Sequence, residues 1–405
     1  MSEHLDAPDS PRSRIAIVTQ DPLNRGGVLR LVEYIYQRAL AAGLEPTLLH
    51  YASFKGWPNL SVSLMNAASG EFNLTPKSHH YQFEGMNAIA IGARFPEYPP
   101  QRIGRNALWD KALASFDRAI LVTGSAQTGF PLVGQDLSFV AWVSAIVDED
   151  RRERLSHAAG VEASVERATL GQIKRAELAV LKSAEKVIAV SNDAARAVAS
   201  LLGGRTVEAW PFPIDTDLFK PSTLPRKRQL LFVGRAGDPR KRLSLFLDAL
   251  ELLRRNSELE AVRVIVVSAM PIDEALCEAY KELMPSIDVL GGLSVKALAE
   301  LYATSTALVI TSEQEGLSIA TMEAMSSGTP VISTRCGGPE MLIEEGVSGF
   351  LVDATSESVA SRISELLLDP PIAASLGSRA RERMLSKFSE KVWNQRFEEL
   401  LRLSR

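Results

Sequence analysis

Four charged residues in the second half of the chain are of types that could do chemistry: Arg235, Lys241, Glu315 and Glu323. Arg235 directly follows a short apolar run and Gly234, and Lys241 comes six residues later. Arginine offers a planar fork of donors and lysine a compact charge, and both suit the oxygens of a phosphate or diphosphate. The pattern indicates a phosphate site, while the alternative interpretation is that both are ordinary surface cations.

The two glutamates lie in the segment TSEQEGLSIATMEAMSSGTPVISTRCGG, residues 311–338. Glu315 is expected in a loop between a strand ending near Thr311 and a helix starting near Leu317, where unpaired N–H groups would attract phosphate. Glu323 is expected inside the helix, where its carboxylate could accept from two adjacent hydroxyls of a ribose or hexose. Without the surrounding sequence, the two glutamates could equally well be solvated charges or helix caps and bind no ligand.

The wider segment resembles the signature of glycosyltransferase family four, in which Glu, seven residues and Glu are followed by Ala-Met and then Gly-x-Pro-Val. The matching residues are Glu315, Glu323, Ala324, Met325, Gly328, Pro330 and Val331. Further segments similar to that family are NRGGV (24–28), EKVIAVSNDAARAV, PIDTDLF, LLFVGRAGDPRKR (230–242) and GGPEMLIEEGVSGFLV (337–352). The resemblance implies the GT-B fold and net retention of configuration at the anomeric carbon.

The resemblance implies Arg235, Lys241 and Glu315 as catalytic residues. Breaking a sugar–phosphate bond pushes negative charge onto the departing diphosphate, which two cations would stabilise most in the transition state. The implied donor-binding residues are Gly26, Gly27, Gly234, Gly291, Leu293, Gly316, Leu317, Ser318, Ile319 and Glu323. Backbone N–H groups of Ser318 and Ile319 would contact the phosphate. Gly26 and Gly27 would let the backbone approach a bound group closely, but without the resemblance a plain turn is an equally good interpretation of them.

The acceptor side departs from the family pattern. Many members carry a histidine after the fourth strand of the first domain, whereas the matching stretch here, VTGSAQTG at 122–129, has none. Ser125 and Gln127 are candidates to replace it as neutral hydrogen-bond partners. Asp148 and Glu149 follow an apolar run, where they could bind acceptor hydroxyls or act as a general base; a helix-cap role is the alternative.

Short runs rich in Val, Ile and Leu alternate with helical patterns and indicate buried parallel strands. The expected strands are 14–19, 46–51, 87–93, 117–124, 138–147 and 186–191, then 229–234, 262–269, 286–292, 306–311 and 330–334. This alternation predicts an α/β protein with two Rossmann-like, doubly wound domains facing across a cleft.

The expected domain bounds follow from these runs. Residues 1–13 form a disordered tail, 14–210 an acceptor domain, 211–221 a proline-rich linker and 222–388 a nucleotide-sugar donor domain. The amphipathic helix at 389–405 is expected to return to the first domain. His79 and His80 are expected in a solvated polar loop.

The composition is that of a globular protein: 405 residues, 46% hydrophobic, 23% charged and net charge −4. This balance argues against a dedicated nucleic-acid binder. Cys277 and Cys336 form no CxxC pair, which favours a reducing compartment. The N-terminus lacks a secretory pattern and no apolar run approaches membrane-spanning length. We expect a cytoplasmic protein whose membrane contact is at most peripheral, at the inner face.

No metal or other cofactor is expected. The Asp-x-Asp triplet at 215–217 has the shape of a metal-binding loop but lies in the linker, and Arg235 and Lys241 can supply the positive charge. The expected partner is a nucleotide-diphosphate sugar, UDP-linked as first choice and GDP-linked as second. The acceptor stays open among lipid-linked glycans, small molecules and proteins.

The predicted function is metal-independent transfer of a hexose-type sugar to that acceptor with retention. One alternative is a nucleotide-sugar binding protein without turnover. Another is an NAD-dependent oxidoreductase, which would need the GxGxxG fingerprint and a following acid, and the sequence carries neither.

Overall fold

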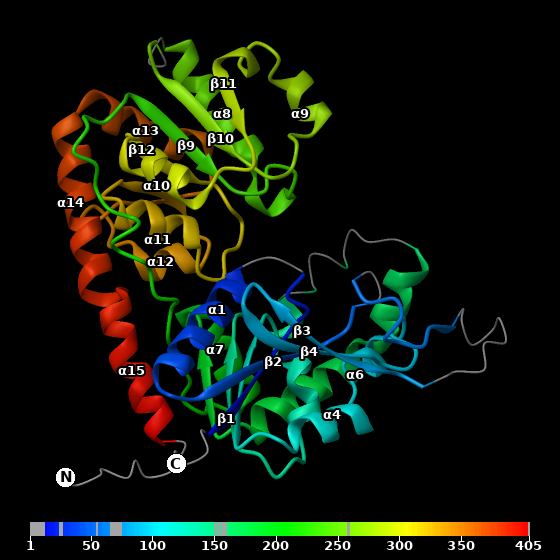
Figure 1. Ribbon diagram of the computed structural model, residues 1–405. Helices are drawn as coiled ribbons and strands as arrows, with labels where there is room; N and C mark the ends of the chain where they lie inside the picture. Colours follow the sequence, from blue (N-terminus) through cyan, green and yellow to red (C-terminus); the bar gives the residue numbers. More distant parts are fainter. Residues whose placement is uncertain are drawn as a thin grey trace, which may run out of the picture. The chain divides into compact units, whose positions relative to one another are not determined.

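The structure is a computed structural model that describes residues 13–23, 27–53, 56–64, 75–149, 151, 155, 160–256 and 260–403. The chain divides into two compact units, each built on its own sheet (Figure 1). The first unit runs to Val190 and continues over Ala194–Trp210. The second comprises Pro211–Leu403 together with Ser191–Asp193.

The first unit holds an eight-stranded sheet of order β3-β4-β2-β1-β5-β6-β7-β8. All neighbours pair in parallel except β3 with β4. The strands are β1 (Arg14–Thr19), β2 (Glu45–Tyr51), β3 (Ser78–Phe83), β4 (Met86–Ile91), β5 (Arg118–Thr123), β6 (Phe139–Val143), β7 (Lys186–Ala189) and β8 (Glu208–Ala209).

Both faces of this sheet are buried. Ala16 and Val18 of β1 join a core with residues of α4 and α6, while Ile15 and Ile17, which alternate with them, are also fully buried. The helices of this unit are α1 (Gly27–Ala41), α3 (Pro99–Arg102), α4 (Ala107–Leu113), α6 (Val161–Ser183), α7 (Asn192–Leu201) and the 3-10 helix η1 (Ala126–Leu132).

The second sheet is parallel throughout, in the order β11-β10-β9-β12-β13-β14. Its strands are β9 (Gln229–Val233), β10 (Arg263–Val267), β11 (Ile287–Leu290), β12 (Ala307–Ile310), β13 (Val331–Thr334) and β14 (Phe350–Val352). The chain builds outward from β9 in one direction and then crosses to β12 in the other. The strand order therefore reverses between β9 and β12, the place where such sheets bind ligands.

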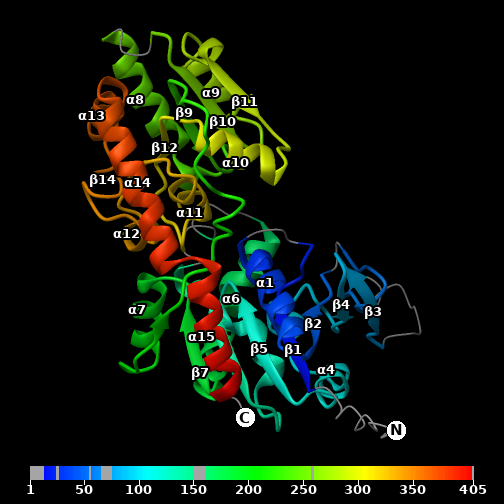
Figure 2. The same cartoon turned by 60° about the vertical axis from the view of Figure 1, so that its left-hand side comes forward.

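Helices α8 (Leu243–Arg255) and α13 (Ser356–Leu368) lie side by side over this sheet, as Figures 1 and 2 show. Their buried residues, such as Phe246 and Ile363, join one core with Phe232 of β9. The other helices are η2 (Pro239–Lys241), α9 (Glu274–Ala279), η3 (Met284–Ser286), α10 (Val295–Ala303), α11 (Ile319–Ser326), α12 (Gly338–Leu342), α14 (Pro370–Lys387) and α15 (Glu390–Leu403). None of the described helices has the length and apolar character needed to span a bilayer.

The predicted α/β class with two doubly wound sheets is confirmed. The polar loop expected around His79 and His80 is wrong, because these residues form β3, an antiparallel edge strand paired with β4. In the proline-rich linker, Ile214 pairs with Ser389. Helix α15 clusters with the second unit, and its predicted return to the first domain stays a prediction.

Candidate active site

Lys241 and Glu315 meet at the point where the second sheet reverses its strand order. Lys241 Nζ donates to Glu315 Oε1 at 2.5 Å, and Ser312 Oγ donates to the same oxygen at 2.7 Å. A Cβ on Gly234 would lie 3.6 Å from Lys241 Cδ, so the lysine stem passes over this glycine. Both side chains are only partly exposed, 21% for lysine and 12% for glutamate, which strengthens their attraction.

The loops that carry these two residues are joined by hydrogen bonds to backbone carbonyl oxygens. Thr311 Oγ1 donates to the carbonyl oxygens of Lys241 at 3.1 Å and Arg242 at 2.9 Å. Glu313 N donates to Arg240 O at 2.8 Å. These bonds connect the loop after β9 with the loop after β12, so the ammonium and the carboxylate are positioned by two adjacent strand ends.

Arg235, the other predicted cation, is held by Asp238, which the sequence analysis missed. The two form an ion pair of 2.7 Å, and Asp238 also binds the Arg240 guanidinium at 2.9 Å. Burial alone would raise the pKa of Asp238, but the hydrogen bonds and charge of Arg240, with Arg235 adding, lower it. Asp238 caps η2 by accepting from Arg240 N, and the Asp-Pro pair at its start was the available signal.

The segment from Glu315 to Leu317 packs tightly against the start of α12. Glu315 N donates to Cys336 O at 2.7 Å, and Gly338 N donates to Glu315 O at 2.8 Å. A Cβ on Gly338 would come within 2.5 Å of the Leu317 carbonyl carbon, so only glycine allows this approach. Gly316 is exposed and Leu317 is buried. Burial, with the charge of Glu315, raises the pKa of the Cys336 thiol to about 12, so this thiol stays neutral.

Helix α11 begins at Ile319, two residues later than predicted. Ser318 precedes it with φ 64°, a left-handed conformation that is strained for a residue with a side chain. Its hydroxyl bonds Thr321 Oγ1 at 2.9 Å and makes no capping bond to the backbone. The N–H groups of the first turn are therefore left without a side-chain cap, which suits an anionic ligand.

Glu323 lies inside α11, as predicted, but its side chain is nearly buried. It is 3% exposed and accepts from the Tyr302 hydroxyl of α10 at 3.1 Å. A carboxylate has acceptor capacity beyond one such bond, so its binding of a donor hydroxyl stays a prediction.

Gly291 and Leu293 follow β11, at the same edge of the sheet. A Cβ on Gly291 would lie 3.1 Å from Ser268 O, which brings the loops after β10 and β11 close together. The Ser268 hydroxyl accepts from Ala236 N at 2.9 Å and so also ties in the loop after β9.

The candidates of the first unit lie after β5 and β6. Ser125 lies just before η1 and Gln127 lies within it, and both are buried. Gln127 Oε1 has no hydrogen-bond partner among the described residues. Asp148 forms an ion pair with Lys174 of α6, and Glu149 lies beside it. Gly27 begins α1, while Gly26 lies outside the described residues.

Glu177 on α6 is a buried residue that the sequence analysis missed. Its carboxylate accepts from Val147 N at 3.0 and 3.1 Å and from the backbone of Ala126, so it joins the loops after β5 and β6. Desolvation outweighs these bonds and raises the pKa of Glu177 to about 7. Within the amphipathic run of α6, nothing in the sequence sets this acid apart from its solvated neighbours.

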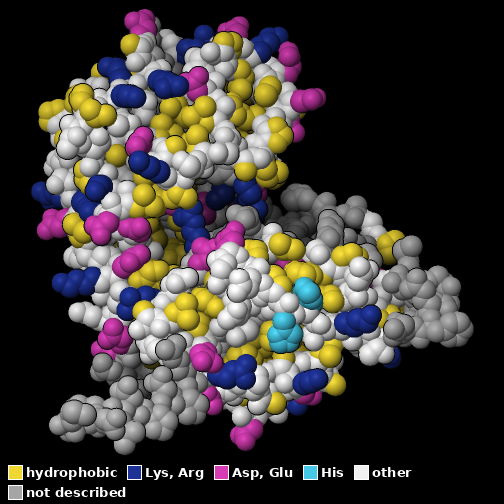
Figure 3. Space-filling view, viewed as in Figure 1, with side chains coloured by type: hydrophobic (Ala, Val, Ile, Leu, Met, Phe, Trp, Pro, Cys, Tyr) yellow, Lys and Arg dark blue, Asp and Glu magenta, His cyan; other side chains and the backbone are white. Residues whose placement is uncertain are grey.

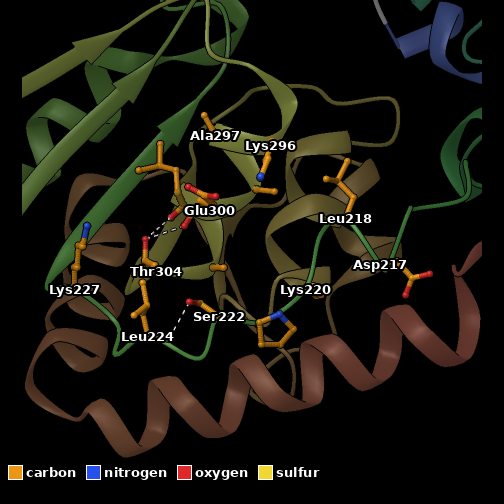
Figure 4. Close-up of a pocket in the computed structure, with 14 residues that line it drawn as sticks. Asp217, Leu218, Lys220, Ser222, Leu224, Lys227, Lys296, Ala297, Glu300 and Thr304 are labelled. Carbon is orange, nitrogen blue, oxygen red and sulfur yellow. Dashed lines mark hydrogen bonds between the residues drawn. The ribbon is translucent and has the colours of Figure 1, made fainter.

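A cavity of about 580 Å³ in the second unit lies between the linker and α10 (Figure 4). Leu218 and Ser222 line it on the linker side, and Lys296 and Glu300 line it on the helix side. None of the predicted site residues contributes to its walls. It is therefore separate from the Lys241–Glu315 site.

A family model described as glycosyl transferases group 1 matches residues 227–369. Residues 227–369 belong to the glycosyl transferases of group 1. This group 1 segment contains the Lys241–Glu315 pair, the start of α11 and Gly291, and the family predicted from the Glu-seven-residue-Glu signature is confirmed for it.

The chain is 27% identical over 270 residues to an MMP alpha-(1->4)-mannosyltransferase of Mycolicibacterium hassiacum. This match covers 65% of the chain and 63% of the relative, so the chain spans less than two thirds of the length of that protein.

Two solved structures share the fold of the group 1 segment and of the unit before it. Sucrose-phosphate synthase from Thermosynechococcus elongatus has a TM-score of 0.69 at 20% identity, covering 97% of this chain and 99% of that one. Anabaena Alr3699/HepE in complex with UDP-glucose has a TM-score of 0.65 at 17% identity, covering 96% and 99%. The predicted GT-B fold is confirmed by these likenesses.

Proposed function

We propose that this protein is a retaining glycosyltransferase that moves a hexose from a nucleotide-diphosphate sugar to an acceptor hydroxyl without a metal. The observation that carries the proposal is the Lys241–Glu315 pair at the strand-order reversal of a group 1 domain. UDP is the first choice of donor nucleotide, because a neighbour of the same fold is in complex with UDP-glucose. GDP is the second choice.

The chemistry needs stabilisation of a departing diphosphate. Lys241 is largely desolvated beside Glu315. The N-terminus of α11, which begins four residues after Glu315 and has no side-chain cap, supplies further positive potential. As the bond from the anomeric carbon to the diphosphate oxygen breaks, both would stabilise the charge that develops on that oxygen. Arg235, held by Asp238, is the second cation assigned to the diphosphate.

Retention follows if the acceptor attacks from the side that the diphosphate leaves. The acceptor oxygen then forms the new bond to the anomeric carbon, and its proton passes to a phosphate oxygen of the leaving group. This step uses no general base, which agrees with the absence of a histidine at 122–129.

A thermal-shift panel of UDP, GDP, ADP, dTDP and their common sugar conjugates, with and without EDTA, tests the proposal. A ligand that binds only the folded state raises the melting temperature. We expect one nucleotide diphosphate to stabilise the protein equally in both conditions. A shift with NAD in place of these ligands, or no shift at all, would contradict the proposal. Binding without turnover would favour a nucleotide-sugar binding protein.

A further inference from the structure

Three aromatic side chains gather in the first unit, at residues the proposed function does not use. Trp57 lies 4.8 Å from Tyr81 and 5.9 Å from His79, measured between ring centroids. The rings of His79 and Tyr81 are nearly parallel, at 12° and 6.1 Å. We call these three residues the aromatic platform. His79 is exposed, and Trp57 and Tyr81 are partly exposed.

The aromatic platform lies at the ligand-binding edge of its sheet. Trp57 belongs to the loop after β2, and His79 and Tyr81 stand two residues apart on β3. Because β3 is antiparallel and Ser78 pairs with Ile91, the last residue of β4, the start of β3 lies at the carboxyl ends of the parallel strands. Ligands of α/β sheets bind at this edge. Figure 3 shows exposed histidines beside hydrophobic side chains on one face of the protein.

A buried hydrogen-bond network fixes the orientation of the platform. The Tyr81 hydroxyl lies 2.7 Å from Nε2 of His50, and Nδ1 of His50 lies 3.0 Å from Tyr51 O. Nδ1 must donate to that carbonyl, so Nε2 accepts from Tyr81. Burial lowers the pKa of His50, which agrees with this neutral ring. Tyr81 therefore presents its ring in one orientation before any ligand binds.

Asp21 positions the loop that carries Trp57. It is fully buried and accepts from Leu23 N at 3.0 Å and from Ser53 N at 3.1 Å. One carboxylate thus joins the loop after β1 to the loop after β2. Burying a carboxylate completely is energetically costly unless its oxygens accept hydrogen bonds. Side chains held in place by such buried hydrogen bonds are typical of a preorganised site.

We propose that the aromatic platform binds the apolar face of a pyranose ring, so that the acceptor is a saccharide or carries one; this identification of the acceptor rests on the proposed function. The C–H groups of a sugar ring can lie against the negative faces of aromatic rings. Trp57 is tilted by 56° from Tyr81 and by 46° from His79. Such an open angle suits a puckered ring better than a flat base, which stacks between parallel faces.

The hydrogen-bonding groups at the platform also suit a polyhydroxylated ligand. The indole Nε1 of Trp57 is buried without an acceptor in the part of the chain that the structure describes. The exposed His79 ring has two nitrogens that can bond hydroxyls. Sugar binding needs both stacking faces and such polar groups at their edge.

Saturation-transfer difference NMR on the full chain tests this, with methyl α-glucopyranoside, methyl α-mannopyranoside, N-acetylglucosamine and maltose as saccharide probes and uridine as the flat-ring probe. We expect transfer from protein aromatic protons to the ring protons of at least one saccharide. Trp57→Ala and Tyr81→Ala should each weaken its binding roughly three- to tenfold. Tyr81→Phe keeps the ring and loses only the His50 bond, so its loss should be smaller.

The matched control is His80→Ala, because His80 alternates with His79 and Tyr81 along β3 and faces the other side of the strand. Its saccharide binding should be unchanged. Saccharide binding that is unchanged in both Trp57→Ala and Tyr81→Ala, transfer to uridine alone, or no transfer to any saccharide would overturn the proposal. Nucleotide-induced stabilisation of the same variants confirms folding, and its absence in the wild type would contradict the proposed glycosyl transfer but not the platform.

Discussion

At the scale of single residues, Lys241 and Glu315 neutralise each other through a 2.5 Å bond before any ligand is present. The sequence motifs predicted both residues but not this bond, because 73 residues separate them and only the packing of two strand ends brings them together. A diphosphate that binds Lys241 must therefore compete with, or be shared with, a resident carboxylate.

Lys241→Ala and Glu315→Ala are each expected to lower turnover by about a hundredfold or more, because each removes a contact to developing charge. Steady-state kinetics with the donor found by the thermal-shift panel measures this. Lys220→Ala is the matched control, since Lys220 is an exposed lysine of the same unit outside the site. Wild-type turnover in a folded Lys241 or Glu315 variant would remove that residue from the mechanism.

Glu323→Gln is expected to weaken donor binding by about tenfold with a smaller change in turnover at saturating donor. Glutamine keeps the shape and a bond to Tyr302 but loses the charge that favours two hydroxyl donors. Isothermal titration with the donor gives the affinity. Tyr302→Phe serves as comparison, because it breaks the 3.1 Å bond and leaves the carboxylate intact. Unchanged donor affinity in Glu323→Gln would refute its role as a ligand.

At the scale of elements, the approach of α12 to the loop before α11 depends on a missing side chain. Gly338→Ala would place a Cβ 2.5–2.6 Å from three backbone atoms of Leu317, so the loop carrying Glu315 must shift. We expect donor affinity to fall by at least about tenfold, and the free energy of unfolding to fall by about 1–3 kcal/mol.

The control for this prediction is Gly171→Ala. Gly171 lies within α6, and an added Cβ meets nothing within 4 Å. Alanine there should stabilise the protein by about 0.5–1 kcal/mol and leave donor affinity unchanged. Urea unfolding and donor titration of both variants provide the test. A Gly338→Ala protein with normal affinity would show that the loop tolerates displacement.

Glu177 ties two strand-end loops to α6 and makes the stability of the first unit depend on pH. Its pKa rises from 4.5 to about 7 on folding. Between these values the unfolded chain has lost the proton that the folded protein still holds, so stability falls as pH rises through this window, by up to about 1.4 kcal/mol per pH unit.

Glu177→Gln is expected to remove this decline, because glutamine cannot ionise and can still accept from Val147 N. Urea unfolding at several values between pH 4.5 and 8 measures the slope. Glu45→Gln, an exposed residue of the same unit, should keep the wild-type slope. Equal slopes for wild type and Glu177→Gln would contradict the assignment.

Elements that are apolar on both faces were predictable, and those that depend on their neighbours were not. The runs at 14–19 and 229–234 became β1 and β9, because buried parallel strands are apolar on both faces. β3 was missed because only one of its residues, Phe83, is buried. The predicted start of α11 was two residues too early, because Ser318 adopts a left-handed conformation that no local sequence pattern indicates.

At the scale of the whole molecule, the sequence predicted two sheets and a linker, and the contacts within the chain divide it at Trp210 and Pro211. The family model covers only part of the second unit. The proposed acceptor site was less predictable than the proposed donor site, because its residues follow no shared motif. Asp21, His50 and Trp57 come together with β3 only in the folded sheet, where the strands lie in the order β3-β4-β2-β1.

Hydrogen exchange of the full chain with and without the stabilising nucleotide is expected to show protection concentrated in two segments, Gly234–Lys241 and Glu315–Ile319. Ligand at about a hundred times its Kd stabilises the protein by about 2.7 kcal/mol, which slows opening of the loops that hold it. Protection confined to the first unit would contradict the assignment of the donor site. A Lys241→Ala protein should show weaker protection at the same nucleotide concentration.

The outer strands of the first sheet bear on solubility. An edge strand exposes unpaired N–H and C=O groups, which invite pairing with other chains. At one border β3 carries exposed polar side chains, including both histidines, and at the other β8 is only two residues long. Neither border offers a long apolar template for intermolecular pairing. The strand that carries His79 and Tyr81 of the aromatic platform is therefore also one that resists edge-to-edge aggregation, and replacing its polar residues with apolar ones would remove that protection.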